Sequence, residues 1–451
     1  MRSSPVRSNS FRNSSVMPLT LLSLSLLVSM VALVVDGGTL IEDRRHVQAA
    51  ADTAALAAAA DLFTNYNTNH GTDPSGTAKA SALSTAAANG FNHDGVQSTV
   101  TVSVSPSAYQ SGPNAGKKLP AGYVEVNLQY NADRLFSGMF GSGTIPVRAR
   151  AVARGIWGAD SNGVILLSLK ASGALSDSSS SPLLISGGLE VNSKSSTAIS
   201  ITSLGTVTAS QFNLNQAAGS LGGSLLSHLS GLSGASPTVN YGSPAPDPLR
   251  NLAEPDPVAL GLTQQGTNLH ISSGTKDLYP GIYKGGITVS GGATAILHAN
   301  SDGTPGIYYL QGGGLTISGP STMKMATGET AGVMIYNDWS SSANAIVLSG
   351  SGTLTINPPA SGLYEGISIF QKRGTLTSAA PTLTLSGSGT MNITGTIYAA
   401  YAKVSMSGSS GTNVMGGQLI ADRLTLTGSA TISINPGTNP IANTRKLGLV
   451  E

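Results

Sequence analysis

The acidic and basic side chains in the C-terminal two thirds of the chain are few, and each stands alone. Those that could act as general acids, general bases or binding cations are Asp302, Glu329, Asp338, Glu365, Asp422, Lys372, Arg373 and Arg423. Cleavage of a glycosidic bond needs two carboxyl groups within about 10 Å of each other, and other acid–base chemistry needs equally close partners. Because these residues occur singly, mostly at turn-like positions, the sequence predicts charges on solvated loops and no catalytic residue.

Five aromatic side chains offer a second kind of site, a surface on which sugar rings could stack. They are Tyr308, Tyr309, Tyr336, Trp339 and Tyr364, and their alternative role is to pack at the edges of strands. A nucleophilic serine would need a nearby base. His298 is the nearest base in the later repeats, and it has no carboxylate neighbour in the sequence. The glycine run at 312–314 lacks the Lys-Ser/Thr step of a phosphate loop.

The sequence contains no pattern for metal ions, cofactors or nucleic acids. The chain has no cysteine, and its six histidines, at positions 46, 70, 93, 228, 270 and 298, show no metal-ligand spacing. The net charge of +2 is small, and the basic residues do not cluster with aromatic ones as in a strand-binding groove. We therefore predict no metal site, no cofactor, no disulfide and no nucleic-acid partner.

An uncharged window at residues 13–35 predicts a transmembrane helix. Its apolar part, Met17–Val35, has nineteen residues, and that number spans roughly 29 Å as a helix, close to the hydrocarbon thickness of about 30 Å. Three arginines within residues 1–12 precede the window and acidic residues follow it, which by the positive-inside rule places the N-terminus in the cytoplasm and the bulk of the chain outside. A cleaved signal peptide is the alternative, but its apolar core is shorter and ends at a cleavage site that this sequence lacks. We expect a single-pass inner-membrane protein whose residues 13–35 contact the lipid bilayer.

Residues 36–155 combine two alanine-rich segments with three alternating ones. Alanine is the strongest helix former, so the first segment would continue the anchor outward as a helix to about Phe63. The second would begin at Asp73-Pro74, a capping residue before a first-turn proline, and run to about Asn89. Alternating apolar residues predict strands at 96–104, 123–130 and 145–153. The region is therefore predicted to be a small, membrane-proximal α+β domain.

Part of this region resembles a known family. The residues that carry the resemblance are Asp36-Gly37-Gly38, Arg44-Arg45, Gln48, Ala50-Ala51-Asp52, Ala54-Ala55, Phe140-Gly141 and Ala151-Val152-Ala153-Arg154. Over residues 13–155 the chain resembles TadG-type proteins of the tight-adherence (Flp) pilus-assembly system, although Ser14-Ser15-Val16 stands where that family often has a basic pair followed by Gly. The resemblance implies an envelope protein linked to pilus or surface assembly. It implies pilus-assembly or other envelope proteins as partners, and it offers no catalytic residues to carry over.

From about residue 163 to residue 451 one pattern recurs: apolar-x-apolar, Ser/Thr-Gly, small residues, apolar-x-apolar. Its copies lie at 287–297, 315–325, 346–356, 383–393, 404–414 and 424–434, with a weaker copy at 183–191. Their Ser/Thr-Gly glycines are 20 to 37 residues apart, a period typical of repetitive coiled architectures. We therefore predict a right-handed parallel β-helix-like domain in which Ile317, Leu348 and Leu385 take equivalent inward positions. A β-sandwich or a set of hairpins is the alternative, although the bends are Ser-Gly rather than the Asn-Gly of tight hairpins.

Residues 236–262 interrupt this pattern. The segment carries six prolines, which remove backbone donors and break regular structure. We expect an ordered excursion across the coil, or a linker between early repeats at about 163–235 and the later ones. The repetitive region also resembles the β-helical extension of some TadG-like proteins.

Two functions fit a chain that is mainly β behind an N-terminal transmembrane helix. The first is a non-catalytic, membrane-anchored cell-envelope protein, a component or accessory of Flp pilus assembly or of surface adhesion. The alternative is an extracytoplasmic β-helix enzyme or lectin that acts on surface polysaccharide. An acid cluster on one face of the β domain would favour this alternative, whereas a smooth Ser/Thr face would favour the structural protein.

Overall fold

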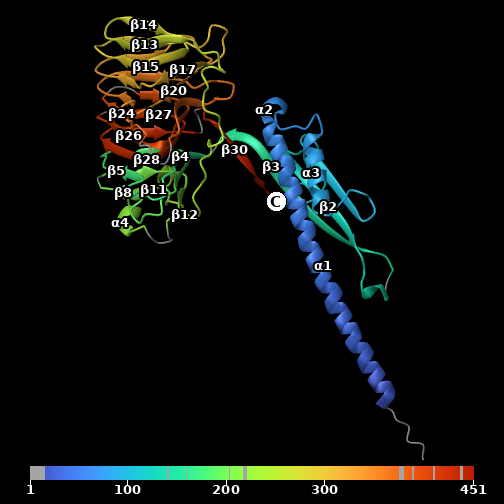
Figure 1. The fold of residues 1–451 in the computed structure, drawn as a ribbon. Helices are drawn as coiled ribbons and strands as arrows, with labels where there is room; N and C mark the ends of the chain where they lie inside the picture. Colours follow the sequence, from blue (N-terminus) through green and yellow to red (C-terminus); the bar gives the residue numbers. More distant parts are fainter. Residues whose placement is uncertain are drawn as a thin grey trace, which may run out of the picture. The chain divides into compact units, whose positions relative to one another are not determined.

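The computed structural model divides the chain into two compact units, Met1–Trp157 with Arg445–Glu451 and Gly158–Thr444 (Figure 1). The residues whose structure is described are 16–139, 142–159, 161–202, 204–216, 221–374, 380–388, 391–409, 412–436 and 440–450. The predictions for residues 1–12, for the first residues of the 13–35 window and for Phe140-Gly141 lie outside these residues.

The first unit begins with one continuous helix, α1 (Val16–Thr64), of 49 residues. Its first part carries large apolar side chains that are exposed, among them Leu22 and Leu33. Within the described residues, α1 is the helix that is long and apolar enough to cross a membrane. The helix passes through Gly37-Gly38 without a break, so the predicted continuation of the apolar helix to about residue 63 is confirmed.

The second part of α1 packs on a four-stranded sheet together with α3 (Thr77–Ala88). The sheet has the order β1 (Ser98–Val104), β2 (Tyr123–Ala132), β3 (Ile145–Ala159) and β30 (Asn443–Leu449), and the first three strands are antiparallel. The short helices α2 (Tyr66–Asn69) and η1 (Ser137–Met139) lie in connections. Alanines line the buried face of both long helices, and their small side chains allow close packing. At one contact a Cβ on Gly155 would collide with the carbonyl oxygen of Ala59.

The predicted start of the second helix is wrong by three residues. The helix begins at Thr77 behind Gly76, whereas Asp73-Pro74 lies in the preceding turn. Asp73 still accepts a hydrogen bond from the backbone N–H of Lys79 at 3.0 Å. Asp73 therefore accepts a hydrogen bond from one of the backbone N–H groups of the first turn that have no partner within the helix, although it is not the capping residue.

A buried ion pair fastens the loop between β1 and β2 to the sheet. The Glu125 carboxylate is fully buried and accepts hydrogen bonds from Arg150 Nε at 2.7 Å and from the backbone N–H of Gln110 at 2.5 Å. Burial alone would raise the pKa of Glu125, but these hydrogen bonds and the Arg150 charge outweigh it and hold the pKa below its ordinary value. The stabilisation is therefore present above about pH 4.5 and is lost as the pH falls through the lower folded-state pKa.

We expect Glu125→Gln to destabilise the first unit by about 3 kcal/mol at neutral pH, because it leaves Arg150 without its buried counter-charge. Hydrogen exchange of the β1 and β2 amides in the full chain should accelerate. Acidification should also accelerate this exchange in the wild type, because Glu125 becomes protonated. The effect of acidification should be smaller in the variant, which has no carboxylate at this position. Glu42→Gln, on the exposed face of α1, is the matched control. Equal exchange rates in the two variants would contradict the assigned role of the pair.

The second unit consists of two parallel sheets of sixteen and ten strands. The sixteen-stranded sheet contains β4 (Asn162–Leu166), β5 (Leu175–Asp177), β7 (Gly188–Val191), β8 (Ile199–Ile201), β10 (Phe212–Leu214), β12 (Val239–Tyr241), β13 (Gln264–Ile271), β15 (Gly281–Val289), β17 (Gly306–Gln311), β18 (Leu315–Ile317), β20 (Val333–Asp338), β21 (Ile346–Leu348), β23 (Ile367–Gln371), β24 (Leu383–Gly387), β26 (Thr396–Gly408) and β28 (Gln418–Gly428). The ten-stranded sheet contains β6 (Leu183–Ile185), β9 (Val207–Thr208), β11 (Leu229–Ser230), β14 (Thr275–Leu278), β16 (Thr294–Leu297), β19 (Thr322–Met325), β22 (Thr353–Ile356), β25 (Met391–Ile393), β27 (Thr412–Met415) and β29 (Thr431–Ile434). The short helices α4 (Gly223–Leu226) and η2 (Leu232–Gly234) lie between strands.

Successive strands come in sets of three that stack on the next set. β17, β18 and β19 pair with β20, β21 and β22 respectively, always in parallel. In each set we call these strands the first, second and third. The long strands β26 and β28 each form both the first and the second strand of their set, and they pair with each other over both parts. Apolar side chains from both sheets meet in one continuous core. Such stacking explains why the repeat is apolar at alternating positions.

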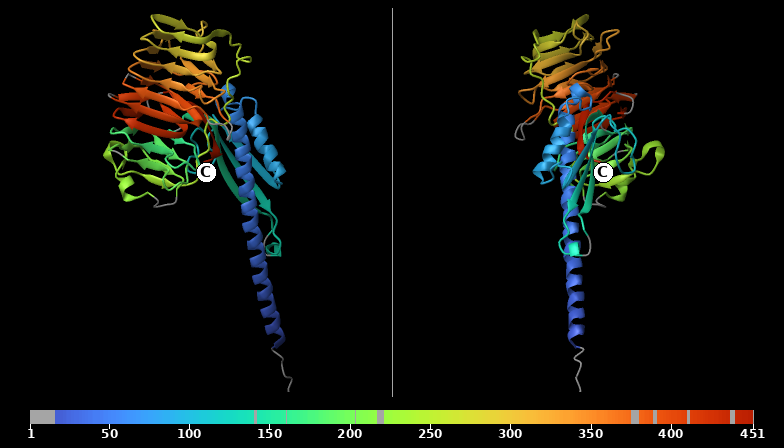
Figure 2. Two further views of the ribbon diagram at one scale, coloured as in Figure 1. Left: turned by 60° about the vertical axis from the view of Figure 1, so that its left-hand side comes forward. Right: turned by 90° about the vertical axis from the view of Figure 1, so that its right-hand side faces the viewer.

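The stacking order differs from the chain order (Figure 2). From one end to the other the first strands of the sets run β13, β15, β17, β20, β23, β26, β28 and then β4, β7, β10, β12. The last of the later strands, β28, therefore pairs with the first early strand, β4, with Leu419 opposite Val164. The proline-rich segment connects β12 at one end to β13 at the other, so it is the return path of the chain. Its predicted lack of regular structure is wrong at Val239–Tyr241, which forms β12 against β10.

The predicted inward column is confirmed. Ile317 lies opposite Leu348, and Leu348 opposite Leu385, with 0%, 3% and 0% of their surfaces exposed. The weaker copy at 183–191 differs from the others, because its first apolar triplet, Leu183–Ile185, belongs to the ten-stranded sheet and pairs with β29. In the other copies the first triplet belongs to the sixteen-stranded sheet. An apolar-x-apolar triplet has the same appearance on either sheet, so the pattern alone could not separate them.

Candidate functional site

Outward-facing aromatic side chains form a column across four neighbouring strands of the sixteen-stranded sheet. Tyr309, Tyr336, Phe370 and Tyr398 are paired in register from β17 to β26. Neighbouring rings lie 5.0, 5.4 and 4.8 Å apart between centroids, mostly edge to face. All four are buried, because Leu249 and Leu252 of the proline-rich segment pack over them. The column is therefore a covered packing surface and offers no open face for stacking a sugar.

The other predicted aromatics are buried as well. Tyr308 points inward and donates its hydroxyl hydrogen bond to the carbonyl of Leu278 at 2.6 Å. Trp339 donates from Nε1 to the carbonyl of Lys372 at 2.8 Å, and Tyr364 packs beside Phe370. Of the two roles considered for these residues, the structure supports packing.

Arg373 joins the aromatic column to the proline-rich segment. Its guanidinium donates to the carbonyls of Leu249 and Leu252 at 2.5 and 2.9 Å and to the Tyr398 hydroxyl at 2.7 Å. The guanidinium carbon lies 5.2 and 5.1 Å from the ring centroids of Phe370 and Tyr398. This is the geometry of a planar fork that binds carbonyls and stacks on rings at the same time.

Two carboxylates of the proline-rich segment complete this group, which we call the Arg373 cluster: Arg373, Tyr336, Tyr398, Asp247 and Glu254. Asp247 accepts from the Tyr398 hydroxyl at 2.7 Å, and Glu254 accepts from the Tyr336 hydroxyl at 3.2 Å and from the backbone N–H of Arg373 at 2.7 Å. Burial raises the pKa of Asp247, and the Tyr398 hydrogen bond and the Arg373 charge oppose that rise. Burial, and then the nearby carboxylates, raise the pKa of Tyr336 and Tyr398 far above the ordinary value, so both phenols remain neutral donors.

Asp338 and Lys372 form a neighbouring pair on the same face. Lys372 Nζ lies 2.6 Å from one carboxylate oxygen of Asp338, and the Tyr309 hydroxyl donates to the other oxygen at 2.9 Å. Three predicted charges, Asp338, Lys372 and Arg373, are thus brought together on this face. Each of the three already has a protein partner, so the arrangement fastens chain segments rather than presenting a free acid or base.

Of the remaining predicted charges, Asp302, Glu329 and Glu365 lie in turns or loops, whereas Asp422 and Arg423 lie within β28. Asp302 accepts from the backbone N–H of Thr304 at 2.9 Å, and Glu329 accepts from the N–H groups of Ala299 and Ala331 at 3.0 and 3.1 Å. Asp422 pairs with its neighbour Arg423 at 2.8 Å, and Glu365 is exposed in the loop before β23. The prediction of single loop charges is confirmed for Asp302, Glu329 and Glu365, and it is wrong for Asp422 and Arg423, which form a pair on a strand.

His298 has no carboxylate neighbour in the sequence, but the fold gives it one. His298 Nε2 lies 2.8 Å from Asp277 Oδ1, because β14 and β16 are stacked and bring these strand ends together. A second pair joins His270 Nε2 to Ser290 Oγ at 2.8 Å. The two pairs share no residue, so neither supplies the serine, histidine and acid that an acyl-transfer triad requires. Among the described residues, no group of three or more His, Asp or Glu side chains is placed to hold a metal ion.

One buried acid was missed by the sequence analysis. Asp177 lies in an inward column between Leu426 and Ile201, and its side chain is fully buried. Its Oδ1 accepts from the backbone N–H of Ser179 at 2.8 Å, whereas Oδ2 has no hydrogen-bond partner. Burial raises the pKa of Asp177, which favours the neutral acid in this apolar column. The Leu-x-Asp triplet at 175–177 is the signal that could have placed it.

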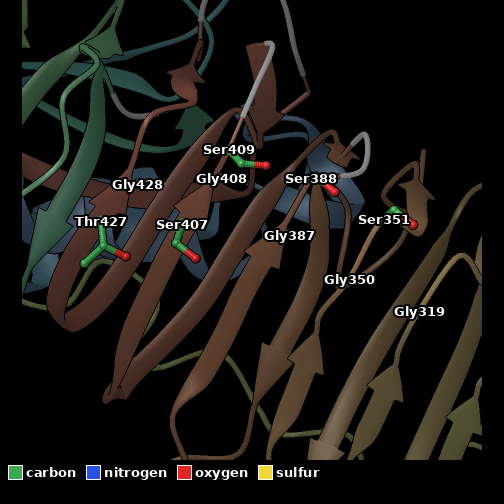
Figure 3. A pocket seen from close by; sticks show the side chains of 10 residues that line it. All are labelled: Gly319, Gly350, Ser351, Gly387, Ser388, Ser407, Gly408, Ser409, Thr427 and Gly428. Atoms are coloured by element: carbon green, nitrogen blue, oxygen red, sulfur yellow. The ribbon is translucent and has the colours of Figure 1, made fainter.

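A shallow groove runs along the Ser/Thr-Gly steps of successive strand sets (Figure 3). Figure 3 shows small hydroxyl side chains and glycines side by side, and the lining residues are Gly319, Gly350, Ser351, Gly387, Ser388, Ser407, Gly408, Ser409, Thr427 and Gly428. The glycines are required by close stacking: Gly350 has φ +91°, and a Cβ there would lie 2.7 Å from the backbone nitrogen of Gly319. The groove therefore presents hydroxyl and peptide groups without a titratable side chain.

Residues 15–61 match a family model with the description "Putative Flp pilus-assembly TadE/G-like". This match supports a relationship between this part of the chain and a Tad-system family. It covers nearly the whole of α1 and none of the second unit. The comparisons with curated proteins and with solved structures find no match. The family match supports a role in Flp pilus assembly and association with pilus-assembly proteins.

Proposed function

We propose that the protein is a non-catalytic, membrane-anchored cell-envelope protein, a component or accessory of Flp pilus assembly. The observation that carries the proposal is the TadE/G-like match over residues 15–61, which falls on the helix whose first part is apolar and exposed. A helix of this kind suits a bilayer on one part of its length and a folded unit on the other.

We infer the orientation from charge. The arginines within residues 1–12 and the acids after residue 35 favour an N-terminus in the cytoplasm and both folded units outside. In this orientation the protein is a single-pass protein of the inner membrane. The surfaces available to envelope partners, or to surface polysaccharide, are then extracytoplasmic.

For the second unit we infer a right-handed parallel β-helix-like coil. Sets of three parallel strands that stack on the next set support a coil, and crossover connections between parallel strands of one sheet are right-handed in nearly all proteins. Stacked sets bury a continuous core that no single set could bury alone. Such a coil is a rigid spacer that can hold a surface away from the membrane.

The non-catalytic role is supported by the state of the charged groups. The carboxylates of the Arg373 cluster accept hydrogen bonds from tyrosines and hold the proline-rich segment, and the tyrosines remain protonated. Polysaccharide binding for adhesion is the second candidate function. The hydroxyl-lined groove of Figure 3 favours it, because neutral sugars bind through hydrogen bonds to hydroxyl and peptide groups.

Deletion of the gene from its host should abolish or strongly reduce Flp pili, and the full chain should restore them. A version in which residues 1–35 are replaced by a cleavable signal peptide should fail, because the folded units would no longer be held at the membrane. Pili are counted by electron microscopy, and anchoring is checked by retention of the full chain in carbonate-washed membranes. Normal pili in the deletion strain would overturn the assembly role, and loss of surface attachment alone would favour adhesion.

A further inference from the structure

The connection between β2 and β3 carries the most exposed pair of adjacent large apolar side chains outside α1 among the described residues. Leu135 and Phe136 expose 61% and 51% of their surfaces. Phe136 is the only phenylalanine in the described part of the chain that is largely exposed. Single exposed apolar residues are normal, whereas an adjacent leucine and phenylalanine at a loop tip indicate a surface that becomes covered.

Asp36 of α1 ties this tip to the helix. Its carboxylate accepts hydrogen bonds from the backbone N–H groups of Phe136 and Ser137 at 3.0 and 2.6 Å. Arg134 bridges the loop by donating from Nε to the carbonyl of Gly143 at 3.0 Å. Irregular backbone can lie beside hydrocarbon only where its polar groups have partners, and these contacts supply several of them. Figure 2 shows the described part of this connection beside α1 in both views.

The tip lies on the membrane side of Asp36. Phe136 lines an apolar cleft together with six residues of α1 between Leu21 and Ala32, all within the apolar window. Ala32 precedes Asp36 by four residues, which is about 6 Å along a helix. Asp36 is the first charged residue after that window. The charged groups Asp36 and Arg134 thus mark the level of the interface, and Phe136 reaches beyond it along the helix.

We propose that the β2–β3 tip is a second membrane contact, in which Leu135 and Phe136 insert among the acyl chains of the leaflet on the side of the folded units. The occupant of the cleft between Phe136 and α1 is a lipid chain. This proposal rests on the anchor of the proposed function. With two contacts, the helix and the loop, the first unit is held at a fixed tilt and cannot swivel about α1. A loop with apolar residues at its tip and charges at its base is the arrangement of an interfacial anchor.

The test uses the full chain in phospholipid vesicles with single cysteines, which is straightforward because the chain has none. A polarity-sensitive fluorophore is attached at Phe136→Cys, and its quenching by bromine on the acyl chains and by iodide in the water is measured. Leu33→Cys, on the exposed apolar part of α1, is the reference for a membrane position. Ser107→Cys is the aqueous reference, because Ser107 is exposed and lies at the end of the sheet opposite to the β2–β3 connection. It follows Val104, which pairs with Val124 at the start of β2, whereas Ser98 pairs with Tyr130 near the end of β2 that leads into the connection.

We expect the label at 136 to lose emission with brominated lipid to the same extent as the label at 33, and to resist iodide. Quenching by iodide at 136, with 33 protected, would overturn this proposal and leave the anchor intact. A label at 136 that neither quencher reaches would also overturn it, because a protein partner would then cover the tip. If the label at 33 is itself open to iodide, the anchor of the proposed function fails and this proposal fails with it.

Discussion

Replacing Leu348 with Asp is expected to unfold the second unit at temperatures where the wild-type chain is fully folded. Leu348 is 3% exposed and lies between Ile317 and Leu385 in the inward column. A carboxylate there has no partner, so the substitution removes apolar burial and adds an uncompensated charge or a strongly shifted pKa. The two effects together cost about 4–5 kcal/mol or more. Thermal unfolding and resistance to a protease, both on the full chain in detergent, measure the loss.

Val347→Asp is the matched control, because Val347 is the adjacent residue of β21 and is only partly buried. Strand residues alternate between faces, so its carboxylate reaches solvent. We expect the control to retain most of the protease resistance while Leu348→Asp loses it. Wild-type resistance in Leu348→Asp would mean that the inward column is not part of the core. Equal loss of resistance in both variants would mean that the inward and outward faces of β21 are not buried differently, contrary to our inference.

The inward positions could be predicted because the Ser/Thr-Gly steps align one strand set with the next. The order of the sets could not. The strands of every set have the same kind of unpaired edge, so the repeat pattern does not indicate which set pairs with which. It therefore could not predict that Leu419 of the last set pairs with Val164 of the first. The signal that was present is the length of the proline-rich segment, which is far longer than the turns between neighbouring sets. A segment of that length can carry the chain back along the stack, whereas a short turn can only reach the adjacent strand.

The Arg373 cluster shows a second limit of the sequence. Three partners of Arg373, namely Leu249, Leu252 and Glu254, are more than 100 positions away in the sequence, and two of these contacts are made by the backbone carbonyls of Leu249 and Leu252. Backbone acceptors carry no residue-type signal. The outward aromatics did carry one. An aromatic ring recurs on four neighbouring strands, at Tyr309, Tyr336, Phe370 and Tyr398, and such a row of large rings argues that this part of the face is covered rather than open to water. His298 and Asp277 likewise meet only because their strand sets are stacked.

Arg373→Ala should release the proline-rich segment from the aromatic column. The substitution removes three side-chain hydrogen bonds and the stacking on Phe370 and Tyr398, and it leaves Asp247 and Glu254 without their nearest cation. Loss of one partner from a buried charged group costs about 3–5 kcal/mol. We expect that cost to appear locally, as cleavage within residues 242–262 during limited proteolysis of the full chain, mapped by mass spectrometry.

Lys372→Ala separates this effect from a general loss of charge. Lys372 is the preceding residue, and its side chain is 40% exposed compared with 16% for Arg373. Solvent screens the Lys372 ammonium in its pair with Asp338, so we expect that pair to contribute only about 1 kcal/mol. The control should keep residues 242–262 protected. Arg373→Lys keeps the charge but loses the planar fork, so it should give intermediate cleavage. Protection of the segment in Arg373→Ala would show that Leu249 and Leu252 hold it by apolar packing alone. Cleavage that spreads at once through β17 to β28 would show that the segment and the strand stack unfold as one, which the local contacts of the cluster do not predict.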